Sequence, residues 1–141
     1  MDLDWLTFDG VNWIGVLAAF FASFALGWIW YSNVAFFPMW LRLGKITDEQ
    51  MKNANMGIAF GGTAVFNLLG VILLAMLMAA LGVTGVGGGA ALGAVLGLVF
   101  RGGAHAIHNG FAVRDPRITL IDAAGDTAGL ALAGAVLGLF A

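Results

Sequence analysis

The sequence predicts an all-α membrane protein, a bundle of four transmembrane helices arranged as two antiparallel hairpins with both termini on the outer side. Hydrophobic residues make up 61% of the 141 residues and charged residues only 10%, and the mean hydropathy is +0.96. A soluble domain carries about 25% charged residues. This chain therefore has too few polar side chains for a water-soluble surface, and we expect a single integral membrane domain over residues 1–141.

Four apolar stretches are long enough to cross a bilayer, which takes about 20 helical residues. They span about residues 12–37, 57–81, 88–108 and 118–140. Each should be α-helical, because lipid offers no hydrogen-bond partners to the backbone.

Residues typical of helix ends mark the boundaries of these spans. Pro38 disfavours helix at the preceding residue and predicts the end of the first span. Gly82 is suited to a left-handed cap at the end of the second span. Asp115 followed by Pro116 predicts the start of the fourth span. A capping-box pattern at residues 47–50 predicts a short surface helix within residues 48–55.

The basic residues predict the orientation in the membrane. Five of the six lie in two loops, residues 38–56 and 109–117, whereas the loop at 82–87 and both terminal tails have none. Basic loops stay on the cytoplasmic side. We therefore expect a multi-pass protein of the bacterial inner (cytoplasmic) membrane with its N- and C-termini outside. As interface anchors we expect Trp13 on the outer side and Trp30, Tyr31 and Trp40 on the inner side.

Small residues recur at four-residue steps in three spans, and such rows allow helices to approach closely in lipid. The row in the first span also contains Ala19 and Ser23. The glycines predicted to pack helices are Gly15, Gly27, Gly89, Gly93, Gly97, Gly134 and Gly138. These rows predict tight packing of the bundle, with a homo-oligomer face as the alternative.

A polar cluster continues the glycine rows of the last two spans. One antiparallel register opposes Arg101 to Asp126, His105 to Asp122, Gly93 to Gly134 and Gly89 to Gly138. An arginine inside a span costs about 2.5–3.5 kcal/mol, and a facing carboxylate lowers that cost. The cluster is either an ion pair that fixes the register of the helices or a proton or ion site, since His105 beside Asp122 could relay protons.

Several other kinds of site are disfavoured. The net charge of −2 argues against nucleic-acid binding, and the chain has no cysteine for thiolate metal sites. No catalytic motif is present, so we expect no enzyme, no catalytic residues and no metal site. His105 and His108 lie on one helix, whereas a bis-histidine haem needs two helices. We therefore expect no cofactor, with pigment or haem ligation by these histidines as the disfavoured alternative.

Two blocks of the sequence resemble a known family. The segment Gly-Trp-Ile-Trp-Tyr-Ser at 27–32 is followed by Phe36, Trp40 and Gly44, and the last span opens with Leu-Ile-Asp-Ala-Ala-Gly at 120–125. This pattern is similar to the small bacterial membrane proteins grouped as domain of unknown function family 1761. The resemblance covers nearly the whole chain. It implies a four-span bacterial membrane protein and supplies no activity.

Short loops and the lack of a soluble site favour a non-catalytic role. We expect an accessory or packing subunit that associates with itself or with a larger membrane complex, with the lipid bilayer around it. The alternative is a small proton- or ion-coupled transporter that uses the intramembrane cluster of Arg101, His105, Asp122 and Asp126.

Overall fold

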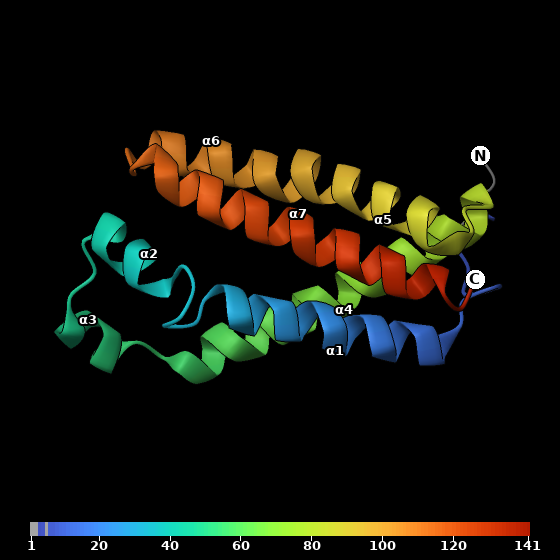
Figure 1. Ribbon diagram of the computed structural model, residues 1–141, viewed down its shortest axis with the longest axis horizontal. Coiled ribbons are helices and arrows are strands. Elements are labelled where there is room, and N and C mark those ends of the chain that lie inside the picture. The colour runs from blue at the N-terminus through green and yellow to red at the C-terminus, as the bar shows by residue number, and fades with distance from the viewer. Residues whose placement is uncertain (1–2, 5) are drawn as a thin grey trace.

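The computed structural model describes residues 3–4 and 6–141, and all the secondary structure in this part of the chain is helical (Figure 1). Four helices are long and apolar enough to cross a membrane, as predicted. They are α1 (Trp13–Trp30), α4 (Met56–Leu81), a continuous helix over Gly85–Phe111, and α7 (Pro116–Gly138). Two short helices, α2 (Phe37–Gly44) and α3 (Asp48–Asn53), lie between α1 and α4.

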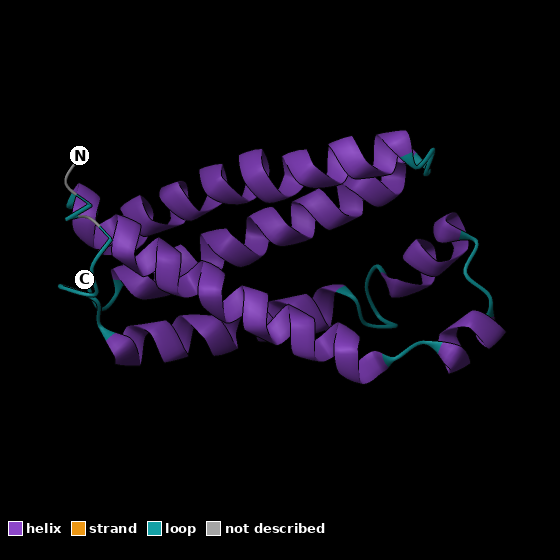
Figure 2. Cartoon of the chain, turned by 180° about the vertical axis from the view of Figure 1, so that it is seen from behind, coloured by secondary structure: helices purple, strands orange, loops and turns teal. Residues whose placement is uncertain are grey.

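The four long helices alternate in direction. The start of α1 and the C-terminus lie at one end of the molecule, and α2, α3 and the turn between α6 and α7 lie at the other (Figure 1). The view from behind shows that α1 and α4 are joined by a long connection that contains α2 and α3, whereas the other long helices are joined by short loops (Figure 2). Helix α7 is central, because it packs against α1, α2, α4 and the whole helix that precedes it.

The first long helix ends earlier than predicted. It stops at Trp30, whereas we expected the span to continue to about residue 37. Pro38 lies in the first turn of α2 and does not terminate α1. A proline costs little in that turn, because the first backbone N–H groups of a helix have no partner within the helix anyway. We predicted that Pro38 ends the first span, whereas in the structure Pro38 lies in the first turn of the next helix.

The other predicted helix ends are confirmed. Gly82 caps α4 in the left-handed conformation, with φ of 66°. The Asp115 side chain accepts a hydrogen bond from the backbone N–H of Arg117 at the start of α7. Thr47 and Gln50 form both bonds of the capping box that opens α3.

The third long helix contains a π-helical turn. It consists of α5 (Gly85–Leu96), the π-helix η1 (Gly97–Gly102) and α6 (Gly103–Phe111). Its buried glycines follow a four-residue step at Gly89, Gly93 and Gly97, and the next buried one, Gly102, comes five residues later. A π-turn accommodates this extra residue. As a result Gly102 faces α7, where an added Cβ would lie 3.2 Å from the Cβ of Ala123.

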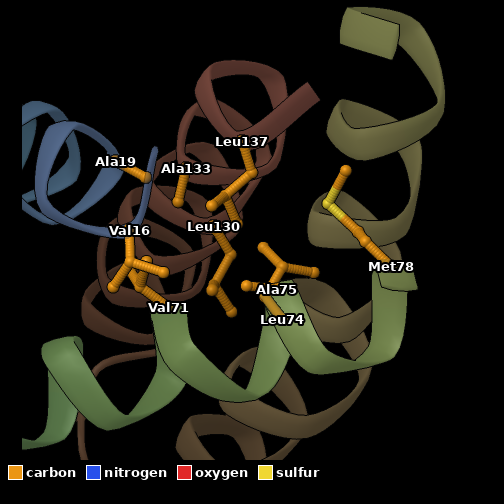
Figure 3. Packing of buried hydrophobic residues seen from close by; sticks show 9 residues of the cluster. All are labelled: Val16, Ala19, Val71, Leu74, Ala75, Met78, Leu130, Ala133 and Leu137. Carbon is orange, nitrogen blue, oxygen red and sulfur yellow. The ribbon is translucent and has the colours of Figure 1, made fainter. Parts of the chain in front are cut away.

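The apolar core lies where α1, α4 and α7 meet (Figure 3). Its fully buried members include Val16 of α1, Val71 of α4 and Ala133 of α7. The neighbours around these three are Ala19, Leu74, Ala75, Met78, Leu130 and Leu137. This core holds the half of the bundle near the two termini, and it leaves large apolar side chains such as Phe21 and Phe66 exposed on the outer faces.

Glycines bring α5 and α7 into backbone contact. A Cβ added at Gly89 would collide with the carbonyl oxygen of Gly134, and one added at Gly138 would collide with that of Gly85. These pairs differ by one helical turn from the predicted register, in which Gly93 opposes Gly134 and Gly89 opposes Gly138. Gly93 instead lies against the carbonyl of Leu130.

Candidate functional site

Asp122 is the buried centre of a polar cluster near the start of α7. Only 7% of the residue is exposed. Its Oδ1 atom accepts a hydrogen bond of 2.5 Å from the Tyr31 hydroxyl and one of 3.1 Å from the indole N–H of Trp40. Its Oδ2 atom lies 4.0 Å from Nδ1 of His105. The carboxylate therefore joins α7 to α6, to Tyr31 at the end of α1 and to Trp40 within α2.

Asp126, one turn further along α7, contacts two basic side chains. Its Oδ2 atom lies 2.9 Å from Nε2 of His105, and its Oδ1 atom lies 3.6 Å from Nη1 of Arg101. About a third of each of these three side chains is exposed. His105 thus bridges the two carboxylates, with one ring nitrogen directed at each.

Arg101 also touches α4. A Cβ added at Gly70 would lie 2.6 Å from Nη2 of Arg101, so the absence of a side chain at Gly70 makes room for the guanidinium. With one guanidinium nitrogen near Asp126 and the other near Gly70, Arg101 lies between α7 and α4. Gly70 therefore makes room for the only arginine or lysine that lies deep within a span among the described residues.

The structure brings together all four predicted members of the cluster, although the shortest contact among these four residues is one that we did not predict. The expected pairs, Arg101 with Asp126 and His105 with Asp122, are separated by 3.6 and 4.0 Å. The shortest contact joins His105 to Asp126. Side chains lean toward the N-terminus of their helix. The side chains of Arg101 and His105 therefore contact residues of α7 about one turn away from those that face their own backbone. The glycines have no side chain, so their contacts show the register of the two backbones directly.

Trp30, Tyr31 and Trp40 have hydrogen bonds that the sequence did not indicate. We predicted them as interface anchors, and the structure directs their polar atoms at α7. The Trp30 indole N–H donates to the backbone carbonyl of Ile121 at 3.0 Å and lies over Gly125, where an added Cβ would be 2.8 Å from Nε1. The residue types alone could have indicated these bonds, because a partly buried tyrosine or tryptophan needs a hydrogen-bond partner for its polar atom.

The remaining predicted positions have simpler surroundings. Gly15 packs against the ring of Phe140, and Gly97 packs against the backbone of Asp126 and Thr127. Gly27 has nothing within 4 Å of an added Cβ, so it packs no helix within one chain. Trp13 is half exposed.

Uncharged side chains also join the long helices. Asn67 of α4 donates a 3.0 Å hydrogen bond to the hydroxyl of Ser23 in α1. Asn109 of α6 donates one of 3.1 Å to the hydroxyl of Thr119 in α7. Such bonds fix the rotation of each helix against its neighbour, because amides and hydroxyls in an apolar environment seek partners.

The charges of the cluster indicate what it can do chemically. Arg101 contributes one positive charge and the two aspartates contribute two negative charges, so one proton makes the cluster neutral. His105 is placed to carry that proton, because both of its ring nitrogens face carboxylate oxygens. The cluster can therefore hold a proton between the two carboxylates, and it can clamp α6 to α7.

Replacing Arg101 tests the contact with Asp126. We expect Arg101→Ala to lower the free energy of unfolding by about 1–2 kcal/mol, less than the 3–5 kcal/mol of a fully buried pair, since both side chains are partly exposed and His105 remains. The double variant Arg101→Leu with Asp126→Ala should recover much of the loss. Unfolding in mixed micelles measures both values, and equal damage in the two variants would exclude a direct contact.

The comparisons with known proteins place the chain in a family. Residues 14–138 match the family described as "Protein of unknown function (DUF1761)". Because the match covers most of the sequence, the chain belongs to this family. No curated protein and no solved structure matches it. The two blocks noted in the sequence, around Tyr31 and around Asp122, are the blocks that hydrogen-bond to each other in the structure.

Proposed function

We propose that this member of the DUF1761 family is a non-catalytic protein of the bacterial inner membrane. In this proposal it forms two antiparallel hairpins with both termini on the outer side. It serves as an accessory or packing subunit that associates with itself or with a larger membrane complex.

The distribution of charge supports this orientation. The five basic residues of the loops, which lie at α2, in α3 and around Asp115, all belong to the end of the molecule opposite the termini (Figure 1). Cytoplasmic loops carry the excess of lysine and arginine.

The observation that carries the proposal is the incomplete cover of the charged cluster. Asp122 is buried and bonded, but Arg101, His105 and Asp126 each expose about a third of their side chain. Lipid cannot hydrogen-bond to these groups, and charge facing hydrocarbon is costly. A second protein packed over this side would complete their surroundings.

Single cysteines test this idea cleanly, because the chain has none of its own. Ala104 lies three residues from Arg101 and so on the same side of the helix. Ala106 lies on the opposite side of α6 and is exposed as well. We expect Ala104→Cys to form cross-links in native membranes, to another copy or to a different protein, and the matched control Ala106→Cys to form none. Cross-linking at both positions, or at neither, would contradict the proposal.

A small proton-coupled transporter is the second candidate, and the position of His105 between two carboxylates favours it. Water instead of protein would then cover the exposed third of the cluster. The Ala104→Cys variant would react with a membrane-impermeant thiol reagent and would not cross-link. Proteoliposomes would also take up protons in a pH-dye assay, and Asp126→Asn would abolish that uptake.

A further inference from the structure

A pocket of about 370 Å³ opens at the end of the molecule that carries the basic loops. One wall is the end of α2 with Lys45, and the other is the turn between α6 and α7 with Arg114. Its volume lies within the range of small-molecule sites, about 300–1,000 Å³. The pocket therefore has room for a headgroup-sized ligand.

The pocket has an excess of positive charge. Within the described residues, neither Lys45 nor Arg114 forms an ion pair. Asp115 also lines the pocket, but the Arg117 guanidinium binds its carboxylate, with Nη2 2.7 Å from Oδ2. The same contact lowers the pKa of Asp115 to about 2, so the two charges compensate each other near neutral pH. Two positive charges remain uncompensated at the pocket.

Other parts of the lining are apolar. Leu43, Ala112, Val113 and the buried Ile118 contribute to the walls. Lys45 and Val113, on opposite walls, both adopt the left-handed backbone conformation, with φ of 53° and 54°. This conformation is unfavourable for a residue other than glycine. The surrounding fold therefore imposes the left-handed conformation on a residue at each side of the pocket.

We propose that this pocket binds the phosphate-bearing headgroup of an anionic phospholipid. The inference rests on the membrane placement given above and is independent of any protein partner. Basic pockets between helices on the cytoplasmic side suit such headgroups, since the cations meet the phosphate and the apolar wall meets the start of the acyl chains. Lys45 and Arg114 would bind the phosphate from the two sides.

Native mass spectrometry of the full-length protein tests the site with phosphatidylglycerol and phosphatidylcholine as probes. We expect tighter retention of phosphatidylglycerol. The double variant Lys45→Gln with Arg114→Gln should bind it about 25-fold more weakly, roughly fivefold for each cation removed. The matched control, Arg42→Gln with Lys52→Gln, removes the same charge from the same end outside the pocket and should bind like the unchanged protein.

Three outcomes would overturn the proposal. Equal losses in the two double variants would mean a general attraction to surface charge. Complete displacement of phosphatidylglycerol by millimolar inorganic phosphate would mean a phosphate site without lipid recognition. No preference over phosphatidylcholine in the unchanged protein would mean no site, and it would leave the subunit role untouched, because the cross-linking of the Ala104→Cys variant does not depend on lipid headgroups.

Discussion

Gly134→Val is expected to separate α5 from α7 and to lower the free energy of unfolding by about 3 kcal/mol or more, the upper end of overpacking costs. An added Cβ at Gly134 would collide with the carbonyl oxygen of Gly89 and would lie 2.6 Å from its carbonyl carbon. Both atoms belong to the backbone, so no side chain can rotate to make room. The two helices would have to move apart, and the contacts on both sides of this pair would be lost with them.

Gly129→Ala is the matched control on the same helix, since nothing lies within 4 Å of a Cβ at Gly129. We expect it to be neutral or slightly stabilising, because alanine favours helix over glycine. Unfolding in mixed micelles measures both variants. A tolerated valine at Gly134 would contradict the backbone contact between α5 and α7.

Asp122→Ala is expected to cost about 2–4 kcal/mol of unfolding free energy. The change removes the acceptor for Tyr31 and Trp40, and a hydrogen bond to a charged group contributes about 1.5–3 kcal/mol. It also leaves two polar atoms without a partner in an apolar environment. The segment between α1 and α2 should loosen, which the fluorescence of Trp40 would report.

The exposed Asp9 provides the control for this substitution. Asp9→Ala removes the same charge at the end near the termini and should change the free energy of unfolding by less than about 0.5 kcal/mol. A similar small effect at both positions would mean that Asp122 holds no neighbouring segment.

The sequence was sufficient to predict that the fold consists of four long apolar helices. Continuous apolar stretches can form only helices in lipid, and local signals such as Gly82 and Asp115 act within one turn of the chain. The polar cluster was also predictable, because Arg101, His105, Asp122 and Asp126 continue the two glycine rows. These features depend on spacing along a single helix or on the simplest pairing of two helices.

Features that arise only from the packing of helices against each other could not be predicted from the sequence. The π-turn at Gly97–Gly102 has no sequence signature, and it places Gly102 against α7. The contacts of side chains and the contacts of the backbone follow different registers between two helices, because long side chains reach one turn beyond their Cα atoms. The bond between Tyr31 and Asp122 joins residues 91 positions apart, and no local pattern reports such a contact.

A double-mutant cycle on Tyr31 and Asp122 tests most directly whether this cluster holds the helices together. The free energy of unfolding is measured for the unchanged protein, Tyr31→Phe, Asp122→Ala and the double variant. We predict a coupling of about 1–2 kcal/mol, since residues in direct contact are not additive. Additive losses would show that the hydroxyl and the carboxylate do not interact, and they would contradict this description of the site.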